Sequence, residues 1–192
     1  MTLFNDYFIP NSSDLLDPPS IKDYPNTNVK YCSLDKYNEL GLSNDYVDYV
    51  IKNCPLQDGF RHTLIDVKTH DLELDEYPCL PGWHIDCRTN YIPRNREIYH
   101  IFVSSDVSLT EFSLSVINSE AMFHKEIPKF YDLEHSTAQI KPLVWNTYDS
   151  YSFHRGSKAQ YNGKRLLIRV CQTNENGVHP QLNLKLIKIK GS

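Results

Sequence analysis

From Gly59 onward, short runs of alternating apolar and polar residues are separated by turn-forming residues. Successive side chains of a strand point to opposite faces of a sheet, so this alternation is typical of half-buried β-strands. Many short strands with few helices favour a β-sandwich or barrel. The candidate strands are residues 61–68, 83–88, 97–104, 110–117, 142–148, 152–155, 165–172 and 182–189.

The N-terminal part of the chain has a different texture. Residues 1–42 are rich in Asn, Asp, Pro, Ser and Tyr, which predicts an irregular wrapping segment. The side chains of Ser43, Asn44 and Asp45 can then cap a short helix that closes near Pro55. We therefore expect one domain over 1–192, with the wrapping segment and short helix in 1–58 and the β core in 59–192.

Composition limits the classes of function. The formal net charge is −4, so bulk binding of duplex nucleic acid is not expected. No apolar run approaches the about 20 residues of a membrane span, and the N-terminus does not resemble a signal peptide. The 5 cysteines are widely spaced and odd in number, which indicates free thiols in a reducing compartment. We expect a soluble, intracellular (cytoplasmic) protein without membrane contact.

One group of residues is a candidate metal site. His84 and Asp86 are two positions apart in the predicted strand 83–88, so their side chains project to the same face. His154, on a distant predicted strand, would complete a set of two histidines and one carboxylate that leaves three positions of an octahedral metal open. An H-x-D pair arises easily by chance, and a lone strand histidine is more often a packing residue, so H-x-D alone is weak evidence.

The predicted strand 165–172 adds a second signal. Alternation places Arg165 and Arg169 on one face and Leu166, Ile168 and Val170 on the other. If the apolar face packs on the core between the sheets, the arginines face a cavity. A planar guanidinium binds a carboxylate through two parallel hydrogen bonds, which suits an anchor for a dicarboxylate. The alternative is that both arginines are exposed on an edge strand.

Together these residues resemble the iron(II)- and 2-oxoglutarate-dependent oxygenase superfamily. Its double-stranded β-helix carries H-x-D on one strand, a distal His on a later strand and an Arg shortly after it, and the matching positions here are His84, Asp86, His154 and Arg165. Residues 99–103 and 108–112 resemble the strand and the G-x-T-x-F segment that follow the first ligands, with Ser108 in place of the glycine. The resemblance leaves the N-terminal third unassigned.

The resemblance implies a mainly β fold, a jelly-roll or cupin-like double-stranded β-helix. To this the N-terminal residues themselves add the irregular segment and one or two short helices. It implies a dioxygenase that couples oxidative decarboxylation of 2-oxoglutarate to hydroxylation of a C–H bond. Fe(II) would be held by His84, Asp86 and His154, and O2 would be the oxidant. Arg165 would pair with the distal carboxylate of 2-oxoglutarate, with Arg169 and Tyr99 as further candidates for binding this co-substrate.

Two other classes of function stay open. A non-oxidative cupin-like metalloenzyme could use His84 and His154, although the usual cupin pattern has a second His where Asp86 stands. A catalytically inactive barrel could act as a binding module, but such a module has no need for the complete ligand set with its Arg anchor.

The substrate is left open among a small molecule, a protein side chain and a nucleobase, and so is the oligomeric state. Residues 88–96, which contain three arginines, and residues 118–140 are candidate specificity loops. Asn146 and Tyr148 are weaker candidates, as hydrogen-bond partners of a metal ligand.

Overall fold

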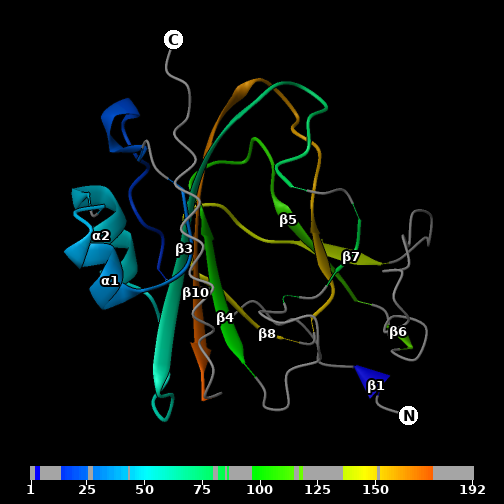
Figure 1. The fold of residues 1–192 in the computed structure, drawn as a ribbon. Helices are drawn as coiled ribbons and strands as arrows, with labels where there is room; N and C mark the ends of the chain where they lie inside the picture. The colour runs from blue at the N-terminus through cyan, green and yellow to red at the C-terminus, as the bar shows by residue number, and fades with distance from the viewer. Residues whose placement is uncertain are drawn as a thin grey trace.

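The computed structural model describes residues 3–4, 14–25, 28–42, 44–79, 82–84, 86, 97–114, 117–118, 136–150 and 152–174. Over these residues the protein is mainly β, with antiparallel sheets and two short α-helices (Figure 1). The predicted strand at 182–189 lies outside them. Among the helices in these ranges, none has both the length and the apolar character needed to cross a bilayer.

The larger sheet has five strands in the order β2-β3-β10-β4-β8, and all neighbours are antiparallel. Its central strand β10 pairs along its whole length with β3 and on its other edge with β4. The alternative that Arg165 and Arg169 are exposed on an edge strand is therefore wrong. The strands are β2 (Val29–Ser33), β3 (His62–Leu72), β10 (Gly163–Thr173), β4 (Ile98–Val103) and β8 (Asn146–Asp149).

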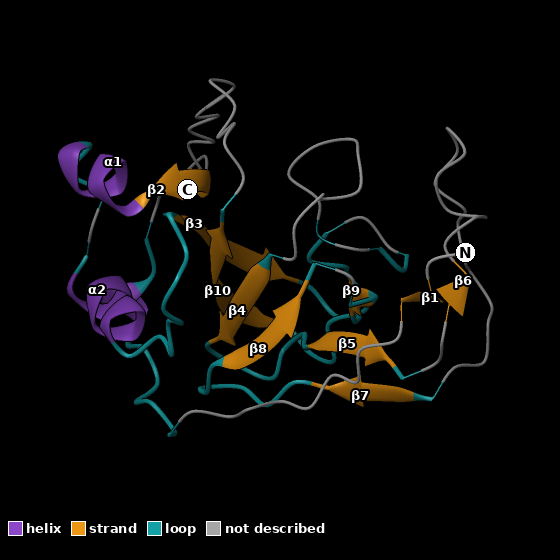
Figure 2. Ribbon diagram, turned by 90° about the horizontal axis from the view of Figure 1, so that it is seen from below, coloured by secondary structure: helices purple, strands orange, loops and turns teal. Residues whose placement is uncertain are grey.

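A smaller sheet faces the first. Its strands run in the order β7-β5-β9, namely Thr137–Gln139, Thr110–Ser113 and His154–Gly156. A separate two-stranded pair joins β1 (Leu3–Phe4) to β6 (Ile117–Asn118). Seen from below, the helices lie on one side of the larger sheet and β5, β7 and β9 on the other (Figure 2).

The helices precede β3 in sequence, and both α-helices follow β2. They are a 3-10 turn (Ile21–Asp23), α1 (Leu34–Glu39) and α2 (Asp45–Lys52). Asn44 caps α2, because its Oδ1 accepts a hydrogen bond from the Val47 amide at 2.8 Å. The predicted helix with its polar cap is thus confirmed.

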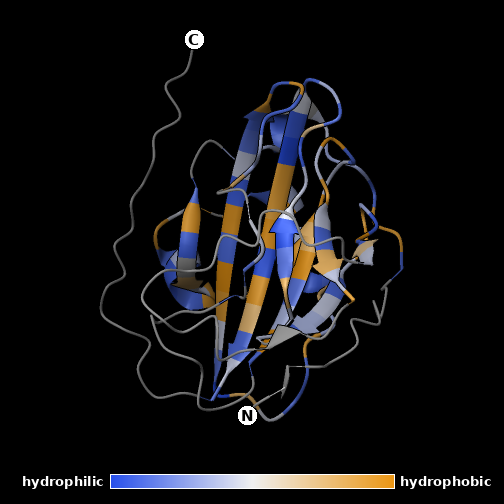
Figure 3. Cartoon of the chain, turned by 90° about the vertical axis from the view of Figure 1, so that its right-hand side faces the viewer, coloured by the Kyte–Doolittle hydropathy of each residue, from blue (hydrophilic) through white to orange (hydrophobic). Residues whose placement is uncertain are grey.

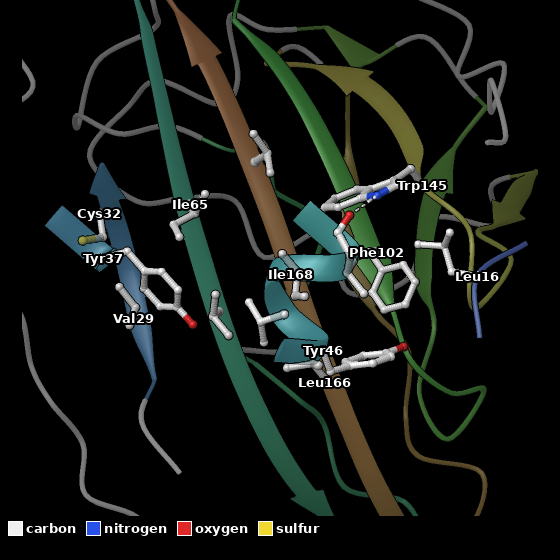
Figure 4. Close-up of a cluster of buried hydrophobic side chains, with 14 residues drawn as sticks. Leu16, Val29, Cys32, Tyr37, Tyr46, Ile65, Phe102, Trp145, Leu166 and Ile168 are labelled. Carbon is white, nitrogen blue, oxygen red and sulfur yellow. Dashed lines mark hydrogen bonds between the residues drawn. The ribbon is translucent and has the colours of Figure 1, made fainter. Parts of the chain in front are cut away.

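The helices cover the outer face of the larger sheet. Val47 and Val50 of α2 are fully buried in a cluster with three residues of β10, Leu166, Ile168 and Val170. Figure 4 shows Leu166 and Ile168 in this cluster together with Trp145 and Phe102. The Trp145 indole also donates a hydrogen bond to the Val50 carbonyl, at 3.1 Å. The apolar face of β10 therefore packs beneath the helices. Packing of this face between the sheets, the condition on which the sequence argument directed the arginines toward a cavity, is not what the structure has.

The side chains on the opposite face of β10 consequently point toward the smaller sheet. Hydrophobic and hydrophilic residues alternate along the long strands (Figure 3), so a strand with its apolar side under the helices turns its polar side inward. A second apolar cluster fills part of the space between the sheets; it consists of Leu64, Tyr99, Ile101, Val103, Leu109, Phe112, Ile140, Tyr148 and Cys171. The remaining inter-sheet space contains the candidate site.

Several boundaries differ from the sequence-based expectation. The segment 1–42 is not irregular throughout, because β2 pairs with β3 and Ser33 then caps α1 by accepting from the Lys36 amide. The predicted strand 142–148 begins only at Asn146, since Leu143 adopts a positive φ of 62° in a turn. The segment 118–140, predicted as a loop, contains β7 near its end.

Candidate metal centre

The two candidate histidine ligands face each other across a strand pair. The His84 amide donates to the His154 carbonyl at 2.9 Å, and the His154 amide donates back to the His84 carbonyl at 2.9 Å. Residues that exchange both bonds in this way lie directly opposite, with their side chains on the same face. The ring centroids are accordingly 4.6 Å apart. Of the predicted strand 83–88, only this isolated bridge at His84 is present in the described residues.

Backbone contacts set the orientation of both imidazole rings. His84 Nδ1 lies 3.0 Å from the Gly82 carbonyl, and His154 Nδ1 lies 3.0 Å from the Ser152 carbonyl. A carbonyl oxygen can only accept, so each Nδ1 carries the proton and each Nε2 lone pair remains for another partner. Hydrogen bonds of this kind commonly orient histidines that bind metals.

Asp86 completes the group. Its Oδ2 lies 3.3 Å from His154 Nε2 and accepts a hydrogen bond from the Tyr148 hydroxyl, while its Oδ1 accepts from the Arg169 guanidinium. Burial by itself would raise the pKa of Asp86. The charge of Arg169, the neighbouring His154 and the hydrogen bonds overcome this effect and hold the pKa well below its usual range, so the carboxylate is charged.

The three side chains converge as the sequence predicted. One ligand atom from each of His84, Asp86 and His154 lies within 4.8 Å of the others. With Nδ1 protonated, the Nε2 of His154 and the Asp86 carboxylate direct electron pairs at each other over 3.3 Å, an arrangement that needs a proton or a cation between them. Burial lowers the pKa of His84 to about 4, so this ring is neutral at pH 7, as a metal ligand must be. The donor set thus fits a divalent metal.

Arg169 binds the carboxylate of the group, Asp86, and a second carboxylate on β3, Asp66. Its guanidinium bridges Asp86 and Asp66, and the Nε atom of Arg169 lies 3.0 Å from Asp66 Oδ2. Asp66 and Asp86 are both almost fully buried. This arginine therefore holds the Asp86 side chain in place through a direct hydrogen bond, and Asp66 holds the arginine.

Arg165 has a different environment. Only 1% of its surface is exposed, and its Nε donates to the Ser108 carbonyl at 2.7 Å. Among the described residues, no acceptor lies within hydrogen-bond distance of its two terminal amino groups. Burial lowers the pKa of Arg165 to about 10, so the group stays charged at neutral pH. A buried charge without a counter-charge is unfavourable, and an anionic ligand would remove that cost.

A cavity of about 100 Å³ lies between the two sheets, beside the His–Asp–His group and Arg165. Its described lining has three cationic side chains and no carboxylate, which favours an anionic occupant. Two lining residues on β3, Lys68 and His70, were not singled out from the sequence. The alternation of Asp66, Lys68 and His70 with Ile65 and Val67 along this strand was the available signal.

The remaining predicted residues have mixed placements. The Tyr99 hydroxyl donates to Glu97 at 2.7 Å and its ring stacks on Tyr148, and Tyr99 is not among the described residues that line the cavity. Asn146 and Tyr148 were the candidates for a hydrogen bond to a metal ligand. The Tyr148 hydroxyl donates to Asp86, whereas the Asn146 amide donates to backbone carbonyls instead. Segments 88–96 and 119–135 of the predicted specificity loops lie outside the described residues.

The serine at position 108, where the resembled sequence pattern has glycine, is accommodated locally. Ser108 is fully buried, and its hydroxyl donates to the Ser157 carbonyl at 2.7 Å. Its own carbonyl accepts the hydrogen bond from Arg165. The departure therefore leaves the position of this arginine supported by the backbone.

The buried histidines make stability depend on pH. Burial, together with the charges of Arg165 and Lys68, lowers the pKa of His70 to about 4, and burial also lowers the pKa of His100. Between about pH 6.5 and 4 the unfolded chain binds protons that the folded protein does not, so the free energy of unfolding should fall as pH falls, by up to about 1.4 kcal/mol per pH unit for one histidine.

Urea denaturation of metal-free protein at several values between pH 7.5 and 4.5 measures this slope. His70→Gln removes one of the titrating groups and should flatten the dependence relative to wild type. An equal slope in the two proteins would show that His70 is protonated as readily in the folded state as in the unfolded chain.

The chain was also compared with known proteins. No protein-family model, no curated protein and no solved structure matches it.

Proposed function

We propose that the protein is an Fe(II)- and 2-oxoglutarate-dependent dioxygenase that hydroxylates a C–H bond of its substrate. The observation that carries the proposal is the combination, around one cavity, of a facing His–Asp–His group and a fully buried arginine without a described carboxylate partner. The His–Asp–His group suits a metal with open coordination positions. The buried arginine suits the distal carboxylate of a dicarboxylate co-substrate.

The strand order supports a double-stranded β-helix as the scaffold. The His84 bridge, between β3 and β4 in sequence, adds a further paired segment beside β9 in the smaller sheet. With this bridge counted and β6 left out, the described chain from β3 to β10 passes between the two sheets at every step except from β5 to β7, which both lie in the smaller sheet. Two antiparallel sheets formed by such alternation are characteristic of jelly rolls. Strands from both sheets then contribute to the interior, where the candidate ligands meet.

The donor set suits Fe(II). His84 and His154 each offer Nε2, Asp86 offers Oδ2, and Tyr148 and Arg169 hold the carboxylate. Three protein ligands would leave further coordination positions of the metal for a co-substrate and an oxidant. The bound metal and co-substrate would supply the oxidation of the C–H bond, while the protein orients them and keeps the site between two packed sheets.

Arg165 would bind the distal carboxylate of 2-oxoglutarate. Its Nε is fixed by the Ser108 carbonyl, so the terminal amino groups are oriented before the co-substrate arrives. Thr110 and His70 line the same cavity, and the buried Nδ1 of His70 has no hydrogen-bond partner among the described residues. Buried polar atoms are normally satisfied, so these groups favour a polar ligand at this end of the cavity.

Anaerobic addition of Fe(II) and 2-oxoglutarate tests the proposal. An iron chelated by this co-substrate gives a weak visible charge-transfer band, which we expect for the wild-type protein. Uncoupled formation of succinate in air is the second expected result.

Iron-loaded, folded protein that shows neither the band nor succinate would contradict the proposal. Metal binding without the band would favour a non-oxidative cupin-like enzyme, and absence of metal binding would favour a module that only binds. Small molecules, peptides and nucleobases that stimulate succinate formation would then identify the class of substrate.

A further inference from the structure

Lys68 is a cation of the cavity that the proposed chemistry leaves unused. It lies on β3 directly opposite Leu167 of β10, between the positions paired with Arg165 and Arg169. Its side chain lines the same cavity as the two candidate histidine ligands. Unlike Arg165, which is fully buried, Lys68 is only partly buried and so can be reached by a molecule that enters from solvent.

The carboxylate that attracts this lysine is already bound to another cation. Asp66 attracts Lys68, but the Asp66 carboxylate is hydrogen-bonded to the guanidinium of Arg169. Among the described residues, no acceptor lies within hydrogen-bond distance of Lys68 Nζ. Lys30 on the neighbouring strand β2 is a further positive charge that acts on Lys68.

The charges of the loaded site can be paired one by one. Asp66 balances Arg169, and Asp86 balances one charge of a divalent metal. The metal-bound carboxylate of 2-oxoglutarate balances the second charge of the metal, and its distal carboxylate balances Arg165. Among the described side chains that line the cavity, Lys68 is the cation left without a counter-charge in this arrangement. A partly desolvated ammonium next to a reaction centre favours an anionic partner.

We infer that the substrate to be oxidised carries an oxyanion, a carboxylate or a phosphate, and that Lys68 binds it. This inference rests on the proposed function, because the charge pairing assumes the metal and 2-oxoglutarate. The lysine is a specificity-determining residue in this arrangement. It positions the anionic end of the substrate, so that a neighbouring C–H bond of that molecule lies beside the metal.

The test uses full-length protein loaded with Mn(II), a redox-inert stand-in for Fe(II), and with 2-oxoglutarate. Inorganic phosphate and acetate are titrated separately by calorimetry, so that the two kinds of oxyanion are distinguished. We expect one of the two anions to bind the loaded wild type, and Lys68→Met to weaken it by about tenfold or more. Lys68→Arg should retain binding, because the positive charge is kept.

Lys164→Met is the matched control. Lys164 lies on β10 and pairs with Asp71 at 2.9 Å on an exposed part of the strand, so its loss changes the net charge equally without touching the cavity. Phosphate or acetate binding should be unchanged in this variant. An equal loss in Lys164→Met and Lys68→Met would mean that the anion senses only net charge, and would overturn the inference.

Two further outcomes would also overturn it. One is a loaded wild type that binds neither anion. The other is a Lys68→Met variant that loses 2-oxoglutarate affinity as strongly as Arg165→Met, which would make Lys68 part of the co-substrate site. Loading is verified first, by 2-oxoglutarate binding to the Mn(II) protein and by the charge-transfer band of the Fe(II) protein. If the proposed function is wrong, this loading step fails. If only the anion site is wrong, loading succeeds and the anion titration fails.

Discussion

His154→Ala is expected to abolish specific binding of Fe(II) while leaving the fold intact. The backbone of His154, rather than its side chain, forms the paired hydrogen bonds with His84, so alanine keeps this strand pairing. The variant loses one of three candidate protein ligands, so only His84 and Asp86 remain to hold the metal. Loss of a hydrogen-bond partner of a ligand already costs about 10–100-fold in metal affinity, so loss of the ligand itself should exceed about a hundredfold.

Anaerobic titration with Fe(II), followed by equilibrium dialysis and metal analysis, measures this effect. His62→Ala is the control, because His62 is another histidine of the larger sheet and lies outside the His–Asp–His group. Circular dichroism and urea unfolding verify that both variants are folded. Iron binding of wild-type affinity in His154→Ala would show that the ligands are wrongly assigned.

Arg165→Met is expected to weaken 2-oxoglutarate binding by about thirtyfold or more while Fe(II) binding is unchanged. Removing one partner of a buried charge pair costs roughly 2 to 5 kcal/mol, and each 1.4 kcal/mol is about a tenfold change in affinity. The ligand-free protein should lose little stability, because methionine replaces a buried charge that has no described carboxylate partner. This separation of co-substrate affinity from stability is the signature of a binding residue.

Titration of 2-oxoglutarate into Mn(II)-loaded protein measures the change. Arg155→Met is the matched control, since Arg155 points away from the cavity on β9 and pairs with Glu111 at 2.8 Å. An unchanged affinity in Arg165→Met would transfer the anchoring role to another cation of the cavity, Arg169 or Lys68.

Local sequence patterns, namely apolar–polar alternation and helix-capping residues, predicted several strands and one helix. Alternation located β3, β4 and β10, and the polar residues before Tyr46 located the start of α2. The same alternation placed His84 and Asp86 on one face, and they do meet His154. The strand β2 was missed, because the prolines and polar residues around Val29–Ser33 hide a short edge strand whose pairing partner is distant in sequence.

The environment of each charged residue was less accessible to sequence reasoning. Arg165 and Arg169 share one face of β10, yet one has no described acceptor for its terminal amino groups and the other bridges Asp66 and Asp86. This difference depends on which residues of β3 and of the 84–86 segment lie opposite each arginine. Lys68 enters the cavity for the same reason, through the pairing of β3 with β10.

The sequence by itself determined which side chains share a face, because the two-residue period of a strand is a local property of the backbone. Only the tertiary structure decided which part of the protein each face packs against. The helices cover the apolar side of β10, and this covering turns Arg165 and Arg169 toward the candidate metal ligands. Long-range strand pairing also brought His84 against His154, since contacts between residues so distant in sequence are set by packing of the whole sheet and by no local signal.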